Sequence, residues 1–191
     1  EVLRESYPDD ALLPEMNKDI ARLQLIAERF SKIGSAPELT EQDVCPIVQR
    51  VGAYFRHRTS SRVTITVSVP SQAVTARVNA PLLEWVFENL CKNAIDAMQG
   101  AGNLTLTLKE SAIVEKRKRY LRVEVNDTGK GIAKNHFQRV FKPGFTTKRR
   151  GWGLGLSLAK RIVEEYHHGR IYVLASEVGQ GTTFAVDIEQ C

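Results

Sequence analysis

Cysteine and long hydrophobic runs are both scarce in this sequence. The 191 residues include 3 cysteines, Cys45, Cys91 and Cys191, an odd number without the spacing of a metal site. We therefore expect free thiols and a reducing compartment. No apolar run approaches the ~20 residues that a membrane-spanning helix needs, and no signal peptide is visible. Because the first residue is Glu1 rather than Met, we also expect a segment of a longer protein.

Acidic residues are outnumbered: 22 Asp and Glu face 27 Lys and Arg, for a net charge of +5. The basic residues gather at 116–119 and 148–150. The first run is expected in a loop between two strands, and no aromatic side chain is interleaved there for stacking on bases. A solvated loop is therefore preferred over nucleic-acid binding. The second run lies between two glycine clusters, where polyphosphate is the simpler partner.

The first predicted element is a helix over about 12–33. Its apolar residues are spaced by three and four positions, which is typical of a helix that packs against another in coiled-coil fashion. They are Leu13, Met16, Ile20, Leu23, Ala27 and Phe30. We expect the partner helix upstream of this chain or on a second copy; the alternative is that the helix folds back on the globular part.

After residue 37 the sequence alternates between helix and strand patterns. Helices are predicted over 43–58, over 81–99 with Asn79 as N-cap, and from Gly155 to an end near His167. Strands are predicted at 63–69 with a neighbour at 73–78, and at 104–108, 120–125, 170–175 and 182–188. We expect an α+β fold, a two-layer α/β sandwich whose mixed, largely antiparallel sheet is covered by about three helices, preceded by the long N-terminal helix.

Two glycine clusters bound the segment that we expect to bind a ligand. The first, Asp-Thr-Gly-Lys-Gly-Ile at 127–132, follows a strand-like run, and the second, Gly-Trp-Gly-Leu-Gly-Leu at 151–156, opens a helical pattern. Glycines spaced two apart let the backbone turn tightly and approach a ligand closely. A glycine-rich turn that leads into a helix also directs free N–H groups at an anion. We interpret the segment as a nucleotide-binding loop that closes over phosphates.

The predicted helix over 81–99 carries a polar stripe. Asn89, Lys92, Asn93 and Asp96 stand at i, i+3, i+4 and i+7, so their side chains project together. Two Asn residues one turn apart lower helix propensity, which calls for another reason for their presence. An amide oxygen is a hard, neutral ligand suited to Mg²⁺ and to phosphate-bound water. The alternative is a pair of buried amides that hydrogen-bond with each other or with the backbone.

Five motifs, taken in order, resemble those of the catalytic, ATP-binding domain of the sensor histidine kinases of two-component systems, which have the GHKL ATPase-kinase fold. They are Asn89-x-x-x-Asn93, Asp127-x-Gly129-x-Gly131, Phe141-x-Pro143-x-Phe145-Thr146-Thr147-Lys148, Gly151-x-Gly153-x-Gly155-Leu156 and Gly181-Thr182-x-Phe184. The first four resemble the N, G1, F and G2 boxes. The resemblance implies a catalytic domain over 37–191. Residues 1–36 look like the second helix, the C-terminal part, of that family's dimerisation and histidine-phosphotransfer hairpin.

The resemblance also implies roles for individual residues. Asp127 would accept a hydrogen bond from the exocyclic amine of adenine, and Thr182 would reach the adenine edge. Asn93 would bind Mg²⁺ through its amide oxygen. Trp152 stands where the family often has a small hydroxyl residue, which leaves a stacking role open. The whole implied ATP-binding set is Asn89, Lys92, Asn93, Asp96, Asp127, Gly129, Gly131, Ile132, Phe141, Thr147, Lys148, Gly151, Trp152, Gly153, Leu154, Gly155, Leu156 and Thr182.

The implied activity is transfer of the ATP γ-phosphate to a histidine on a helix, for relay to a response-regulator aspartate. The acceptor is expected on the first helix of the hairpin, and this chain has histidines only at positions 57, 136, 167 and 168. We therefore expect the acceptor outside the chain and assign no catalytic residue with certainty. The implied partners are ATP with Mg²⁺, the upstream phosphoacceptor helix, a receiver domain and a second copy in a homodimer of the parent. The implied location is the cytoplasm, including the cytosolic part of a membrane-bound sensor.

Two alternatives remain at this stage. A GHKL ATPase that drives a conformational clamp would have Glu at the site of Asn89 to activate water. Glu88 is its neighbour, but neighbours on a helix point about 100° apart, so Asn89 favours phosphoryl transfer over hydrolysis. The second alternative is a non-catalytic nucleotide-binding module that acts by docking partners.

Overall fold

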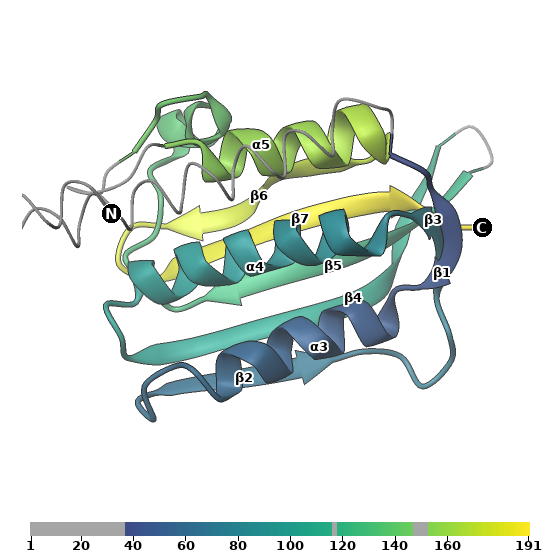
Figure 1. The fold of residues 1–191 in the computed structure, drawn as a ribbon. Helices are drawn as coiled ribbons and strands as arrows, with labels where there is room; N and C mark the ends of the chain where they lie inside the picture. The colour runs from purple at the N-terminus through teal and green to yellow at the C-terminus, as the bar shows by residue number, and fades with distance from the viewer. Residues whose placement is uncertain (1–36, 116–117, 147–152) are drawn as a thin grey trace, which may run out of the picture. The chain divides into compact units, whose positions relative to one another are not determined.

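The computed structural model describes residues 37–115, 118–146 and 153–191. Residues Glu38–Cys191 form one compact α+β unit, in which helices cover one face of a five-stranded sheet. Figure 1 shows this arrangement. The helices are α3 (Cys45–Arg56), α4 (Ala80–Ala97) and α5 (Gly155–Arg161). The predicted helix over 12–33 lies outside the described residues.

The main sheet is mixed and largely antiparallel, as predicted. Its strand order is β2-β4-β5-β7-β6, and only the pair β2–β4 is parallel. The bounds are β2 Val63–Ser68, β4 Gly102–Glu115, β5 Lys118–Asp127, β6 Arg170–Glu177 and β7 Gly181–Glu189. β5 and β7 are neighbours at the centre, so two segments distant in sequence form the middle of the sheet.

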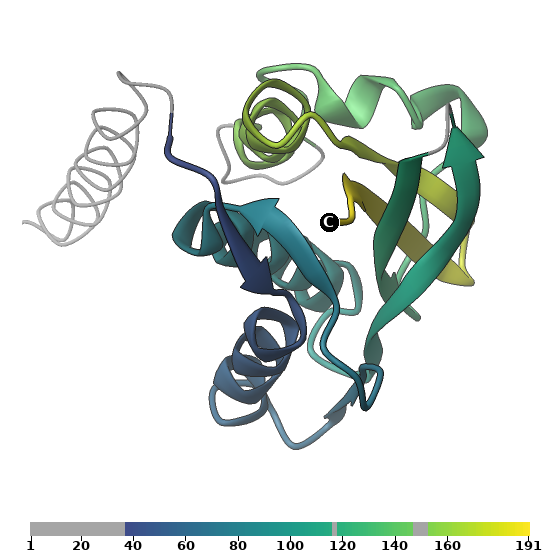
Figure 2. The ribbon, with the colours of Figure 1, turned by 90° about the vertical axis from the view of Figure 1, so that its right-hand side faces the viewer.

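The sheet forms one layer and the helices form a second, and the core lies between them (Figure 2). Successive side chains of a strand point to opposite faces, so alternate residues are buried. The core-facing apolar residues of the three central strands, β4, β5 and β7, are Leu104, Leu106, Leu108, Leu121, Val123, Val125, Phe184, Val186 and Ile188. Helix α4 buries Leu83, Phe87 and Leu90 completely against them. Burying each such side chain stabilises the fold by roughly 1.5–3 kcal/mol.

A second, two-stranded sheet was not foreseen. β1 (Thr40–Asp43) pairs antiparallel with β3 (Thr75–Val78). The prediction that 73–78 neighbours the strand at 63–69 is therefore wrong. Asp43 explains the actual pairing, because its Oδ1 accepts from the N–H groups of Val74 at 3.1 Å and Cys45 at 3.0 Å. One carboxylate thus fixes the end of β1, the approach to β3 and the start of α3, two residues later than expected.

The helix ends follow local sequence signals. The predicted N-cap of α4 is confirmed, because Asn79 Oδ1 accepts from the N–H of Leu82 at 3.2 Å. Helix α5 stops after Arg161, where the predicted continuous helix gives way to a π-helical turn, Ile162–Tyr166. His167 closes that turn, as expected for the helix end: its Nδ1–H donates to the carbonyl of Ile162 at 2.8 Å.

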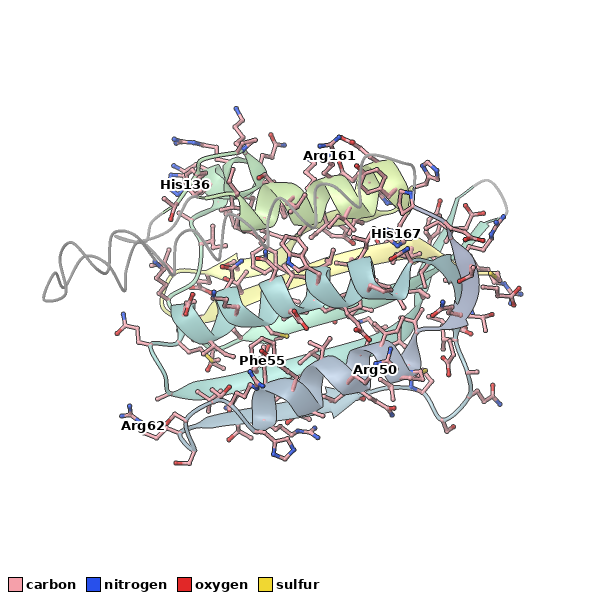
Figure 3. The ribbon with its side chains drawn as sticks, in the orientation of Figure 1. Arg50, Phe55, Arg62, His136, Arg161 and His167 are labelled. Carbon is pink, nitrogen blue, oxygen red and sulfur yellow. The ribbon has the colours of Figure 1, made fainter. Side chains whose placement is uncertain are left out.

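The same histidine joins two helices (Figure 3). Its Nε2 accepts from the backbone N–H of Asn79 at 3.1 Å, directly before α4. His167 is 3% exposed, and burial lowers its pKa. A neutral ring with the proton on Nδ1 satisfies both bonds. His167 therefore ties the end of the α5 segment to the beginning of α4.

The other face of the sheet buries a charge. Asp187 on β7 is fully buried, and its two oxygens accept from Nε and an Nη of Arg122 at 2.7 and 3.0 Å. The hydroxyl of Tyr172 donates to the same carboxylate at 3.0 Å. Beside this cluster, Lys109 and Glu124 form a more exposed pair at 2.7 Å.

The thiols of Cys45, Cys91 and Cys191 are free, as predicted. Burial raises the pKa of the Cys91 thiol to about 12, which fits a core residue. Of the helices in the described ranges, none is both long enough and apolar enough to cross a membrane.

Candidate functional site

A row of paired residues crosses four strands at one end of the main sheet. Leu104 on β4 is paired with Asp127 on β5, Asp127 with Thr182 on β7, and Thr182 with Ser176 on β6. Asp127 and Thr182 are each 3% exposed although both are polar. The next inward-facing residues on β5 and β7 are the apolar Val125 and Phe184. Buried polar side chains at the end of an apolar core mark this row as a candidate ligand site.

Asp127 is held in place by backbone donors. Its Oδ1 accepts from the N–H of Gly129 at 2.7 Å. Burial raises the pKa of the Asp127 carboxyl, while hydrogen bonds from the N–H groups of Gly129 and Thr182 oppose the shift. A carboxylate has about four lone-pair positions, so two donors leave it able to accept from a ligand.

The loop after Asp127 packs between α4 and the β6–β7 turn. Lys130 N–H donates to the carbonyl of Ala97 at 3.1 Å, and Gly179 N–H donates to the carbonyl of Lys130 at 2.8 Å. A Cβ on Gly129 would lie 2.7 Å from the backbone carbon of Ala97. Gly131 has φ +70° and faces the carbonyl of Glu177 with no room for a Cβ. Tight packing is therefore a second reason for both glycines, besides the predicted close approach of the backbone to a ligand.

The polar stripe of α4 is present as predicted. Asn89 and Asn93 are half-buried, whereas Lys92 and Asp96 are exposed. Asn93 Nδ2 donates to Asn89 Oδ1 at 2.9 Å. The two amides therefore do bond to each other, which the alternative interpretation of the stripe anticipated. This bond orients the Asn93 amide with its nitrogen toward Asn89, so the oxygen of Asn93 points away from Asn89.

The second glycine cluster meets this stripe. A Cβ on Gly155, the first residue of α5, would lie 2.6 Å from Nδ2 and 2.7 Å from Oδ1 of Asn89. Gly153, with φ +63°, accepts through its carbonyl from the N–H of Gly144 at 3.1 Å. The start of α5 is thereby in contact with the middle of α4 and with the turn at 143–144.

Phe141 anchors the segment between the clusters. Its ring is 7% exposed and meets the ring of Phe184 edge-on, with centroids 6.1 Å apart. Phe145 makes a similar contact with His136 at 5.6 Å. Phe141 was expected to contact ATP, and the contact seen here is with the core strand β7. The chain around it forms two short 3₁₀ turns, η1 (Lys134–His136) and η2 (Arg139–Phe141), and no regular element crosses 143–144, as predicted.

The structure thus groups the predicted residues into two clusters, both in contact with α4. The first contains Asn89, Asn93 and Gly155, with Gly153, half-buried Leu156 and exposed Leu154 beside it in sequence. The second contains Asp127, Gly129, Gly131, Ile132 and Thr182. Thr147, Lys148, Gly151 and Trp152 lie outside the described residues.

One residue of the second cluster was missed. Ser176 Oγ accepts from the N–H of Ile132 at 2.7 Å and lies 2.9 Å from Oγ1 of Thr182. No motif marks it, and the predicted strand at 170–175 ended one residue earlier. Its register opposite Thr182 would have been the only signal.

Comparison with known proteins gives consistent matches. The family model of histidine kinase-, DNA gyrase B- and HSP90-like ATPases matches residues 78–190. The sensor histidine kinase ZraS of Escherichia coli (strain K12) is 40% identical over 104 residues, which are 54% of this chain and 21% of that protein. The adaptive-response sensory kinase SasA of Synechococcus elongatus is 32% identical over 179 residues, 90% of this chain and 44% of that protein.

A solved structure agrees in fold. Full-length ShkA in complex with AMPPNP superposes with a TM-score of 0.69 at 27% sequence identity, over 85% of this chain and 34% of that one. The chain spans less than half the length of each of these three relatives.

Proposed function

This chain belongs to the histidine kinase-, DNA gyrase B- and HSP90-like ATPases, among their sensor histidine kinases, and from this premise we propose that it binds ATP with Mg²⁺ and transfers the γ-phosphate to a histidine outside the chain. The observation that carries the proposal is the pairing of buried Asp127 with buried Thr182 beside the glycine loop. Burying two polar side chains in an apolar layer costs free energy unless a ligand or the backbone uses them.

Asp127 and Thr182 suit the base end of the nucleotide. An ionised carboxylate only accepts hydrogen bonds, and the exocyclic amine of adenine only donates them. Asp127 is fixed by Gly129, so its orientation does not depend on the ligand. Preorganisation of this kind lowers the entropy lost on binding.

Asn89 and Asn93 suit the phosphate end. Mg²⁺ prefers oxygen ligands, keeps several waters and is usually held by few protein groups together with substrate phosphates. In the part of the chain that the structure describes, no three His, Cys, Asp or Glu side chains gather as a metal site. A single amide ligand on Asn93 fits that donor set only when the phosphates complete the coordination. Bound Mg²⁺ would neutralise charge on the phosphates during transfer.

The same amides favour transfer over hydrolysis. Activation of a water molecule needs a group that can take its proton, and a neutral amide cannot do so. An amide, Asn89, occupies the position on α4 where an ATPase clamp would have a carboxylate. Its side chain is bonded to Asn93 and lies against Gly155. We therefore prefer a kinase to an ATPase clamp.

The acceptor is placed on the first helix of a hairpin whose second helix would be residues 1–36, with residues 37–191 as the catalytic domain. Two histidines of this chain are already engaged. His167 is buried and both of its ring nitrogens are hydrogen-bonded, and the ring of His136 meets the ring of Phe145 edge-on. His57 and His168 are exposed, and the labelling experiment decides whether they accept phosphate. A homodimer of the parent, a receiver domain as the next acceptor and a cytoplasmic location belong to the same proposal.

The test uses ATP labelled in the γ position. The chain alone should bind ATP but stay unlabelled, because in-line transfer needs the nucleophile about 3–3.5 Å from the phosphorus. Addition of the upstream segment of the parent should give label on a histidine of that segment, as an acid-labile, base-stable phosphate. Asn93→Ala should abolish labelling, and Asn135→Ala, a change at an exposed asparagine of η1, should not. Label on a histidine of this chain, or release of free phosphate without labelling, would contradict the proposal.

A further inference from the structure

Ser176 lies at the centre of a hydrogen-bond cluster behind the buried pair. Its hydroxyl oxygen is 2.7 Å from the nitrogen of Ile132, 2.8 Å from the carbonyl oxygen of Gly181 and 2.9 Å from Oγ1 of Thr182. It belongs to the same transverse row of the sheet as Thr182 and Asp127. Ser176 therefore connects the glycine loop at Ile132 to the first two residues of β7, Gly181 and Thr182.

Counting protons fixes the direction of each bond. A serine hydroxyl has one proton and two lone pairs. The carbonyl of Gly181 can only accept, so the proton of Ser176 goes to it. The N–H of Ile132 can only donate, so it uses one lone pair of Ser176. The remaining contact, with Thr182, then requires the proton of Thr182, and Thr182 is the donor to Ser176.

This direction determines what Thr182 offers to a ligand. With its proton committed to Ser176, the hydroxyl of Thr182 presents only lone pairs to any other partner. Its neighbour Asp127, when ionised, is also an acceptor without a proton. Two adjacent acceptors match a group that carries two protons, such as an exocyclic amine. They oppose a carbonyl oxygen, which has no proton to give, because an unpaired buried acceptor is unfavourable.

We propose that Ser176 is a specificity-determining positioning residue: it holds Thr182 as a hydrogen-bond acceptor and so makes the site select a 6-amino purine over a 6-oxo purine. The inference rests on the proposed nucleotide-binding function and adds to it a residue that does not touch the base. Without Ser176, the hydroxyl of Thr182 can rotate and donate to a 6-oxo group. The preference for the 6-amino purine would then decrease, because the 6-oxo purine would bind more tightly.

The test measures binding of ADP and of inosine diphosphate (IDP) to the whole chain by calorimetry. Ser176→Ala should lower the ADP-over-IDP preference about tenfold, with tighter binding of IDP than in the wild type. Ser176→Thr keeps the hydroxyl and should keep the preference. Thr183→Val is the matched control, since Thr183 is the next residue of β7 and its hydroxyl accepts from Asn126 instead.

Each outcome decides the matter. Equal weakening of ADP and IDP in Ser176→Ala would mean that Ser176 only supports the loop at Ile132, and would overturn the inference, as would an unchanged preference. If Ser176→Ala does not fold, Thr182→Val replaces it: the preference must fall without a gain for IDP, and an undiminished preference overturns the inference. A wild-type chain that binds neither nucleotide refutes the proposed function itself.

Discussion

Gly155 and Asn89 are so close that a Cβ on residue 155 would lie 2.7 Å from the amide oxygen of Asn89. Gly155 does not have a positive φ, so its backbone could accommodate another residue. A residue with a Cβ at this position would therefore have to displace the side chain of Asn89. This contact links the second glycine cluster to the polar stripe of α4, which the sequence placed in separate motifs.

Gly155→Ala tests this contact. Alanine is the better helix former by about 1 kcal/mol, yet here its methyl group would displace the side chain of Asn89. We expect weaker binding of Mg²⁺-ATP, by about tenfold, with a smaller effect on ADP. Calorimetry with both nucleotides measures the difference. Ser157→Ala, in the same helix and at a hydroxyl that donates to the carbonyl of Leu154, is the control and should bind ATP normally.

The affinity for ADP should depend on pH through Asp127. Burial raises the pKa of this carboxyl above its usual 3.8, and protonation removes its charge and replaces an acceptor position by a donor, which an amine cannot use. Affinity should therefore be full at neutral pH and fall on acidification, beginning at a higher pH than an ordinary Asp would give. Asp127→Asn should cost about 1–3 kcal/mol of binding at neutral pH and remove this dependence. Titrations between pH 8 and the acid limit of folding check both effects, and Glu177→Gln, an exposed change nearby, should retain the wild-type profile.

The buried ion pair Arg122–Asp187 should contribute more to the stability of the fold than the exposed pair Lys109–Glu124. Arg122→Ala leaves the carboxylate of Asp187 buried without its cation, and we expect a loss of about 3–5 kcal/mol of unfolding free energy. Lys109→Ala breaks the pair with Glu124, in which Lys109 is 48% exposed, and should cost less than about 1 kcal/mol. Urea denaturation of both variants gives the comparison. Equal losses would mean that Asp187 gains little from Arg122.

His167 should make stability depend on pH. Burial lowers its folded-state pKa below the value of 6.5 for an unperturbed histidine, so the unfolded chain takes up the proton first. Its contribution is full above about pH 6.5 and is lost as pH falls from there through the folded-state pKa. His167→Gln should remove this slope and cost about 1–3 kcal/mol at pH 8. His168→Gln changes an exposed residue and should retain the slope in thermal or urea unfolding.

Sequence alone was sufficient wherever periodicity and motif agreed. The alternation in 104–108 predicted a core strand, the closing strand at 182–188 was also predicted, and the Asn stripe was found on α4 as expected. β1 was missed because Thr-Glu-Gln-Asp has no alternation of apolar residues, and its strand depends on Asp43 bonding to Val74. The π-helical turn was missed for a different reason: Ile162–Tyr166 keeps a helical pattern, and the position of His167 at its end depends on a tertiary contact, the bond that its Nε2 accepts from the N–H of Asn79.

The partners of the buried groups were also beyond the sequence. Asp187 reads as an outward-facing strand residue, and its burial comes from Arg122 and Tyr172 on neighbouring strands. Ser176 has no motif, since its role follows from its register opposite Thr182. Both cases depend on which strands become neighbours, and this is set by the packing of the whole sheet.

The central pairing of β5 with β7 has a consequence for synthesis of the protein. Asp127 and Thr182 face each other only after β7 has paired, and β7 is the last strand of the main sheet to leave the ribosome. Until then the nascent chain has the glycine loop and the two Asn residues of α4, but it lacks Thr182 beside Asp127 at the proposed base site. We therefore expect nucleotide to stabilise the fold only after β7 has paired, so the strands made first must stay unaggregated without that help.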